Sequence, residues 1–187
     1  MLLNEARLKQ RMSAAGLDAL IATTPENVTY MSGFWALPQW IRRGPQAYVV
    51  WPAPDKGTPE IIASTSTLDL VADQDVWVSK VRRYGDFYAD VGSSTAMDRA
   101  SERHLQLREL PRHRDAITAL IAALEEAQLG RGRIGIDEAG LAPGYLEALR
   151  AHFLNASFLP ATALLREVRA VKTADEIERL CQFAQID

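Results

Sequence analysis

The sequence predicts an α/β fold in which helices cover a mixed sheet. Segments with helical periodicity alternate along the chain with short runs rich in β-branched and aromatic residues. Two of these runs, residues 47–51 and 59–64, flank the turn segment "PAPDKG" and suit an antiparallel hairpin. The other runs are separated by helical segments, which is typical of α/β domains. The hairpin adds antiparallel pairing to such a sheet, so the sheet should be mixed.

The first third of the chain predicts helix, strand and helix in that order. Residues 4–15 form an amphipathic pattern in which Leu8 and Met12 share one face, and Gly16 follows as a stop. Residues 17–23, "LDALIAT", predict a short buried strand. Residues 24–33 begin with a Thr that can cap a helix and a Pro suited to its first position, and they end with a Gly. We therefore expect one or two helical turns there.

The same signals define the rest of the chain. They predict a short helix at 66–73, a strand at 75–84, a polar loop at 92–103 and a helix at 114–129. After these they predict a strand at 133–137, a helix at 143–153 and a short strand or edge segment at 157–162. Near the C-terminus, Thr173 and Glu176 form a capping box that opens a final helix. Four small or apolar residues then recur at helical spacing with no stop signal, so we expect this helix to lead into a further segment; they are Ile177, Leu180, Cys181 and Ala184.

Charge and cysteine content narrow the function classes. Lys and Arg number 21 against 24 Asp and Glu, and the net charge of −3 lacks the basic surface that nucleic-acid binding needs. The one cysteine, Cys181, cannot form an intrachain disulfide, which suits a reducing compartment, and its place on the apolar stripe predicts a packed thiol. We find no signal-peptide pattern and no apolar run long enough to span a membrane, so we expect a cytoplasmic protein without a membrane partner.

Motifs that carry catalysis are hard to find. "GRGRIG" at residues 130–135 matches G-x-G-x-x-G, but it follows a helix and precedes a strand, the reverse of the order in a dinucleotide site. His104, His113 and His152 form no cluster with metal-ligand spacing. The acidic pair Asp137–Glu138 sits at the edge of a predicted strand and suits a role in capping loops. We therefore expect no catalytic residue, no metal ligand and no enzyme activity in this chain alone.

One loop, "GFWALPQWIRRGPQ", combines large aromatic side chains with two adjacent arginines; these residues are Phe34, Trp35, Trp40, Arg42 and Arg43. Arginine beside aromatic residues suits carboxylate recognition or an interface. In the alternative interpretation, Phe34 and Trp35 fill the domain core while the arginines are solvated. Both interpretations stay open on the sequence alone.

The two ends of the sequence resemble a known family. Residues 7–34 resemble the opening of the N-terminal domain of the creatinase/prolidase (Xaa-Pro peptidase) family, in which a helix precedes a G-[LI]-D-A strand entry and then P-x-N-[IV]-x-Y-x-[ST]-G-[FWY]. The matching residues are Gly16, Leu17, Asp18, Ala19, Pro25, Asn27, Val28, Tyr30, Ser32, Gly33 and Phe34. "LLREVRAVKTADEIERL" is similar to the family's exit motif, L-R-x-[IV]-K-[ST]-x-x-E-[IL], with a few extra residues at 167–170, and "GRIGID" resembles its mid-domain strand.

This resemblance implies a three-layer α/β/α domain with a mixed sheet, similar to a ribonuclease H-like layer arrangement. Residues 1–165 would form the creatinase/prolidase N-terminal domain. Residues 166–187 would form the interdomain linker and the start of a helix that leads to a C-terminal catalytic domain. In peptidase members that second domain holds two divalent metals, usually manganese or cobalt, so no cofactor is expected in this chain.

The resemblance also implies a function: the non-catalytic N-terminal domain of a metal-dependent Xaa-Pro dipeptidase or aminopeptidase, serving dimerisation and substrate access. Its partners would be its own catalytic domain, a second copy, and a peptide or small carboxylate substrate. In the creatinase branch an aromatic-x-Arg pair reaches across the dimer to the substrate carboxylate; Trp40 and Arg42 occupy the corresponding loop, and Arg43 is an equal candidate. The alternatives are a creatinase-like amidinohydrolase or lyase, and a stand-alone interaction module.

Overall fold

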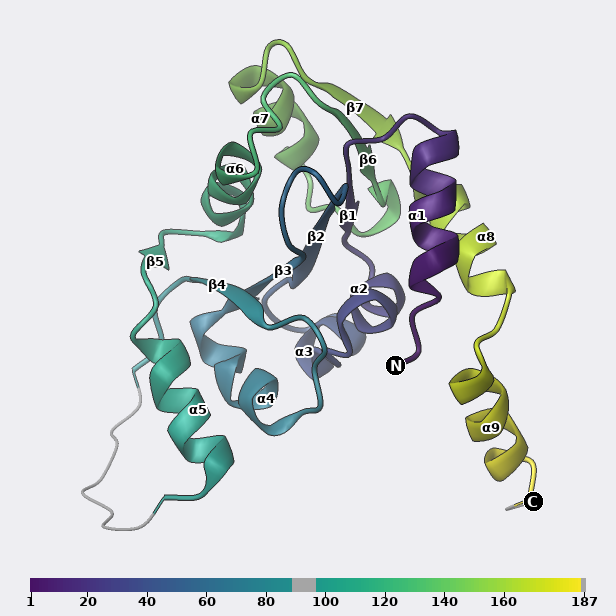
Figure 1. The fold of residues 1–187 in the computed structure, drawn as a ribbon. Helices are drawn as coiled ribbons and strands as arrows, with labels where there is room; N and C mark the ends of the chain where they lie inside the picture. The colour runs from purple at the N-terminus through teal and green to yellow at the C-terminus, as the bar shows by residue number, and fades with distance from the viewer. Residues whose placement is uncertain (89–96, 186–187) are drawn as a thin grey trace.

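A computed structural model describes residues 1–88 and 97–185 and places seven strands in one sheet of order β5-β4-β3-β2-β1-β6-β7 (Figure 1). The strands are β1 (Ala19–Ala22), β2 (Tyr48–Pro52), β3 (Glu60–Ser64), β4 (Lys80–Tyr84), β5 (Arg112–His113), β6 (Arg133–Ile136) and β7 (Ser157–Pro160). β1, β2 and β3 form an antiparallel meander, and the other neighbouring pairs are parallel. The predicted hairpin and mixed sheet are confirmed, and β7 lies at one edge of the sheet.

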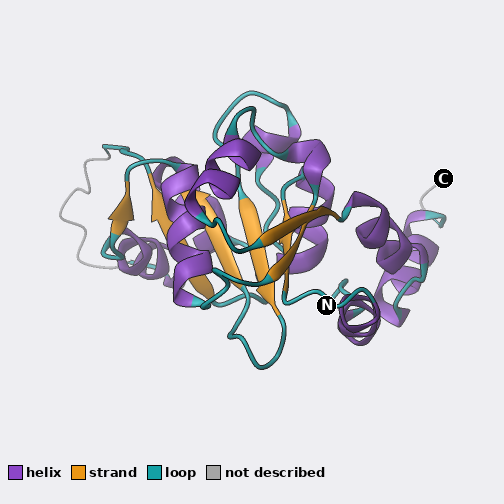
Figure 2. Cartoon of the chain, turned by 90° about the horizontal axis from the view of Figure 1, so that it is seen from above, coloured by secondary structure: helices purple, strands orange, loops and turns teal. Residues whose placement is uncertain are grey.

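Helices cover both faces of this sheet, as Figure 2 shows from above. They are α1 (Glu5–Ala14), α2 (Pro25–Ser32), α3 (Leu37–Trp40), α4 (Leu68–Asp73), α5 (Arg99–Arg108), α6 (Ala116–Glu126), α7 (Tyr145–His152), α8 (Thr162–Ala170) and α9 (Ala174–Phe183). α6 and α7 pack on one face, while α1, α2, α4 and α8 pack on the other. The three-layer α/β/α architecture is therefore confirmed. None of the helices in the described part combines the length and apolarity needed to cross a membrane.

The two hydrophobic clusters explain why the central strands lack an alternating pattern. All four residues of β1 are buried: Leu20 and Ala22 face one cluster, and Ala19 and Ile21 face the other. Successive side chains of a strand point to opposite faces, so a strand covered on both faces must be apolar throughout. This double burial fixes β1 in the middle of the domain, where its carboxyl end meets that of its parallel neighbour β6.

Several sequence predictions need correction. The loop predicted at 92–103 falls partly on residues 89–96, outside the described residues, and from Arg99 the chain forms α5, whose N-terminus is capped by the Asp98 side chain. The predicted strand at 75–84 begins only at Lys80. Neither α3 nor α8 was predicted, although α8 buries Leu165 and Val168 in the core.

The final helix begins as predicted, but its cysteine is not packed as predicted. The Thr173 side chain accepts the backbone N–H of Glu176 over 3.2 Å, and the Glu176 carboxylate accepts that of Thr173 over 2.9 Å, so the capping box is present. Cys181 is exposed, although the apolar stripe predicted a packed thiol. The reason is that α9 lies beside the body of the domain rather than on it (Figure 1), and none of its residues is buried.

Candidate functional site

A pocket of about 740 Å³ lies where β1 and β6 end, which is where open α/β sheets commonly bind ligands. Its walls come from the start of α2, from the loop that follows α3, from residues 139–143 and from α8. We call it the arginine pocket and define it by six of its lining residues, Thr24, Gln39, Trp40, Arg42, Arg166 and Arg169. These residues are distant in the sequence and meet only through the sheet topology.

The aromatic–arginine loop is anchored at one end and exposed at the other. Phe34 is fully buried, whereas Trp35 is 47% exposed and Trp40 is 37% exposed. The Trp40 indole N–H donates to the Thr29 hydroxyl over 3.2 Å, which holds the ring near α2. Arg42 has a φ of 54°, a left-handed conformation that is uncommon for a residue with a side chain. The interpretation in which Phe34 fills the core is thus correct for that residue and wrong for Trp35.

Gln39 connects this loop to the sheet. Its side-chain amide nitrogen donates to the carbonyl of Thr23 over 2.6 Å and to the carbonyl of Ala47 over 3.1 Å. The residue is only 4% exposed, and its Oε1 atom has no hydrogen-bond partner. Rotating the amide by half a turn would place Oε1 against two carbonyl oxygens, so the hydrogen-bond network fixes the present orientation. Gln39 therefore ties the loop to the ends of β1 and β2, and its own Oε1 atom stays buried without a partner.

Asp137 lies at the end of β6, is fully buried, and organises the base of the site. Its Oδ2 atom accepts the backbone N–H of Thr24 over 2.8 Å, the Thr24 hydroxyl over 2.6 Å and the side-chain amide of Asn27 over 2.8 Å. Its Oδ1 atom accepts the Thr162 hydroxyl over 2.9 Å. Burial raises the pKa of the carboxyl, but the hydrogen bonds from Thr24, Asn27 and Thr162 outweigh it and leave the pKa of Asp137 below its ordinary value.

The neighbouring Glu138 has a capping role, as the sequence predicted for the Asp137–Glu138 pair. Its Oε2 atom accepts the backbone N–H groups of Ala161 and Thr162 over 3.1 and 3.2 Å, at the start of α8. The chain that follows the two acids packs closely against the end of β1. Gly140 allows this approach, because a side chain added at Gly140 would collide with the backbone of Thr23. The pair therefore ties β1, β6 and α8 together, and the carboxylates of both acids are engaged by donors.

Two of the three predicted site residues, Trp40 and Arg42, line the arginine pocket, whereas Arg43 is exposed and is not one of its lining residues. Sequence reasoning missed Gln39, Arg166 and Arg169. Arg169 is held in place by a 3.1 Å hydrogen bond from its guanidinium to the Asn27 side-chain oxygen. Arg166 lies in the stretch that resembles the family's exit motif, but no pattern in the sequence marks any of the three as a pocket residue.

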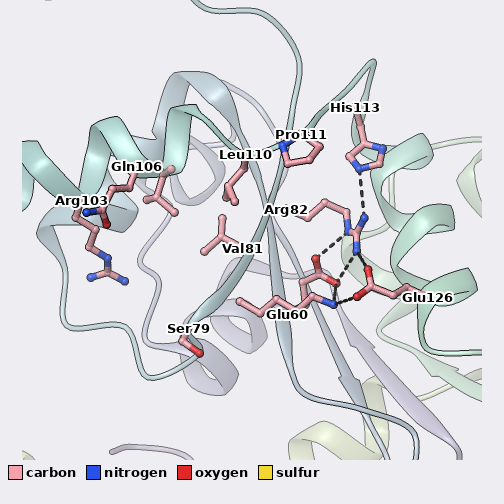
Figure 3. A pocket seen from close by; sticks show the side chains of 12 residues that line it. Glu60, Ser79, Val81, Arg82, Arg103, Gln106, Leu110, Pro111, His113 and Glu126 are labelled. Carbon is pink, nitrogen blue, oxygen red and sulfur yellow. Dashed lines mark hydrogen bonds and ion pairs between the residues drawn. The ribbon is translucent and has the colours of Figure 1, made fainter.

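A second cavity, of about 490 Å³, lies beside β4 and holds a cluster of ion pairs (Figure 3). The Arg82 guanidinium bonds to Glu60 over 2.8 Å and also pairs with Glu126, while Lys80 reaches Glu60 over 3.3 Å and Glu126 over 2.7 Å. Glu60 is buried, and Glu126 lies at the solvent edge. Because all four charges are satisfied within the cluster, we interpret it as a structural link between β3, β4 and α6.

His113 borders the same cluster and has a lowered pKa. Its Nε2 atom lies 3.3 Å from a guanidinium nitrogen of Arg82. Burial disfavours the charged imidazolium, and the positive charge of Arg82 disfavours it further, so the pKa of His113 lies below 6.5. His152 instead pairs with Glu125 over 2.7 Å on the surface. Within residues 1–88 and 97–185, no three His, Cys, Asp or Glu side chains are grouped so that they could hold a metal.

Comparison with known proteins identifies relatives for nearly the whole chain. The family model described as "Creatinase/Prolidase N-terminal domain" matches residues 6–171. No curated protein matches the chain.

Solved structures with the same fold include a dipeptidase from Pyrococcus horikoshii OT3, with a TM-score of 0.59 and 16% identity over 92% of this chain. An Xaa-Pro dipeptidase from Bacillus anthracis has the same TM-score, identity and coverage of this chain. The chain spans 38% and 37% of the lengths of these two proteins. An aminopeptidase P from Streptococcus thermophilus is 20% identical with a TM-score of 0.55, and here the match covers 88% of this chain and 94% of that one.

Proposed function

The chain belongs to the creatinase/prolidase N-terminal domain family, and from that premise we propose that it serves a hydrolase as a non-catalytic N-terminal domain. The hydrolase would be a metal-dependent, cytoplasmic Xaa-Pro dipeptidase or aminopeptidase. The family match over residues 6–171 carries this proposal. It is supported by the fold likeness to two dipeptidases of which this domain spans less than two fifths.

In this proposal residues 1–165 form the domain, and residues 166–187 begin the connection to a catalytic domain. The apolar side of α9 supports that role, because Ile177, Leu180 and Phe183 are 52%, 57% and 69% exposed on a helix with a complete capping box. A capped amphipathic helix gains most of its stability from packing its apolar face. The catalytic domain would cover this face and would supply the manganese or cobalt ions.

The aromatic–arginine loop would serve dimerisation and substrate access. Its tip exposes Trp35, Leu37, Trp40 and Ile41, an apolar group of the kind that protein interfaces cover. Arg42 and Arg43 follow directly, and a guanidinium pairs with a carboxylate through two parallel hydrogen bonds. In a dimer one of these arginines would hold the carboxylate of a peptide substrate bound by the partner subunit.

Expression of the complete open reading frame beside the 187-residue chain tests this function. With manganese added, the complete gene product should hydrolyse an Xaa-Pro dipeptide, and the 187-residue chain should not. Hydrolysis by the chain alone would refute the non-catalytic role. A complete gene product that is inactive on Xaa-Pro peptides but cleaves creatine-type substrates would favour the amidinohydrolase, and a reading frame that stops after Asp187 would favour an interaction module.

A further inference from the structure

We propose that Gln74 is a positioning residue for the aromatic–arginine loop and that it acts through the backbone of Trp35. Gln74 belongs to residues 74–77, a segment that directly follows α4 and that we call the brace. The inference rests on the proposed function of the loop in substrate access. It adds to that function the residue that holds the loop in place.

The side chain of Gln74 binds both backbone polar groups of one loop residue. Its Oε1 atom accepts the backbone N–H of Trp35 over 2.7 Å, and its Nε2 atom donates to the Trp35 carbonyl over 3.1 Å. One donor and one acceptor on Trp35 determine which way the amide faces. The two residues are 39 positions apart, so this pair of bonds fixes the loop to a distant part of the chain.

Burial does not require these two hydrogen bonds. Trp35 is 47% exposed, and both bonds lie at the surface of the domain. A buried backbone group needs a partner within the protein, whereas an exposed group can bond to water instead. The two bonds therefore restrict the conformation of Trp35 rather than satisfy a buried group.

The brace is itself bonded to the segment from which the loop begins. The backbone N–H of Trp77 donates to the Ser32 carbonyl over 3.0 Å, and its indole N–H donates to the Met31 carbonyl over 2.8 Å. Both carbonyls belong to the end of α2, where a helix leaves its carbonyls without partners of its own. Gly33 follows with a φ of 81°, and a side chain there would collide with the Trp77 ring. The brace is therefore fixed relative to the start of the loop.

The position of Trp35 determines where α3 begins. The Trp35 carbonyl, which Gln74 binds, also accepts the backbone N–H of Leu37 over 3.0 Å at the start of α3. α3 and the two arginines that follow it are the part of the loop to which the proposed function assigns the substrate. A loop that is already held in its bound conformation loses less conformational entropy on binding. Loss of the Gln74 bonds should therefore weaken binding at the loop without changing the chemical step.

Hydrogen exchange of the 187-residue chain, followed by NMR, tests the two bonds. Gln74→Met keeps the length of the side chain but removes both of its hydrogen-bonding groups. Exchange of the Trp35 backbone amide should become about threefold to tenfold faster, as expected for the loss of one neutral hydrogen bond. The buried amide of Phe34, which donates to the Ser32 hydroxyl over 3.1 Å, is the internal reference and should not change. Gln10→Met, at an exposed position of α1, is the matched control and should change neither amide.

Two results of the exchange experiment would overturn the proposal. An unchanged Trp35 amide in Gln74→Met would show that Gln74 does not hold the loop. Equal acceleration at Trp35 and Phe34 would show that the substitution loosens the domain in general.

Steady-state kinetics of the complete gene product test whether Gln74 positions the loop for the substrate. Gln74→Met should raise KM for an Xaa-Pro dipeptide about threefold to tenfold and leave kcat within about twofold of the wild type. In the Arg42→Ala/Arg43→Ala background, which lacks the groups to be positioned, the same substitution should change KM by less than about twofold. A fall in kcat at unchanged KM, or an equal rise in KM without the two arginines, would overturn the positioning role.

The two experiments separate this inference from the proposed function. If the complete gene product does not hydrolyse Xaa-Pro peptides, the proposed function fails. Hydrogen exchange of the 187-residue chain still decides whether Gln74 holds Trp35, because it needs no enzyme activity.

Discussion

Asn27 and Asp137 are 110 residues apart in the chain, yet the side-chain amide of Asn27 donates a 2.8 Å hydrogen bond to the Asp137 carboxylate. The Asn27 oxygen in turn accepts a hydrogen bond from Arg169. One asparagine thus connects the end of β6 with α8 through the first turn of α2. The elements that form the arginine pocket are held together by this network, so its disruption should affect both stability and the site.

Replacing the buried acid tests the network directly. Asp137→Asn keeps the size of the side chain but replaces an acceptor oxygen by an amide that cannot accept from Thr24 and Asn27. We expect the free energy of unfolding to fall by about 3 kcal/mol in urea titrations, because buried donors lose a charged partner. Asp55→Asn, in an exposed turn, is the control and should stay within about 0.5 kcal/mol of the wild type. A similar loss in both variants would contradict the account.

The same carboxyl group should make the protein acid-sensitive. The pKa of Asp137 in the folded state lies below its ordinary value of 3.8, so the unfolded chain binds the proton more readily. The stabilisation from Asp137 is therefore complete well above pH 3.8 and is lost as the pH falls below it. In urea titrations at decreasing pH, the difference in the free energy of unfolding between the wild type and Asp137→Asn should become smaller. If that difference in free energy stays constant down to about pH 2.5, protonation of Asp137 does not destabilise the fold.

The ion-pair cluster at β4 provides a matched pair of variants. Glu60 is buried and Glu126 is exposed, and both pair with Arg82. Glu60→Gln should lower the free energy of unfolding by about 2–3 kcal/mol. The reason is that the largely buried guanidinium of Arg82 keeps only one carboxylate partner, Glu126 at the solvent edge. Glu126→Gln should cost less than about 1 kcal/mol, as surface pairs do. Chemical denaturation measures the free energy of unfolding of both variants. If both lose the same amount of it, burial does not determine how strongly these ion pairs stabilise the fold.

His113 should titrate at unusually low pH. NMR titration of its imidazole should give a pKa below 6.5, because burial and the positive charge of Arg82 both disfavour the charged ring. Arg82→Gln should raise that pKa while leaving it under 6.5, since burial is the larger cause. His152, which is exposed and paired with Glu125, serves as the internal reference signal. An unchanged His113 pKa in Arg82→Gln would rule out the influence of the guanidinium.

The sequence predicted those helices and strands that are marked by residues within the element itself. The start of α9 was predicted because Thr173 and Glu176 are three residues apart, and the central strands because burial on both faces demands continuous apolar runs. α5 escaped prediction because its sequence, RASERHLQLR, is mostly charged and polar and carries no clear apolar stripe. The arginine pocket was predicted only through Trp40 and Arg42, since Gln39, Arg166 and Arg169 reach it by tertiary packing alone.

The central claim, that the aromatic–arginine loop serves a peptide substrate, is tested most directly by steady-state kinetics of the complete gene product. Arg42→Ala and Arg43→Ala are compared with the wild type on an Xaa-Pro dipeptide and on its C-terminal amide. At least one variant should raise KM for the dipeptide about 10-fold or more with little change in kcat, because a charged hydrogen bond contributes about 1.5–3 kcal/mol, and KM for the amide should hardly change. If both variants retain the wild-type KM for the dipeptide and for the amide, the loop has no role in holding the substrate carboxylate.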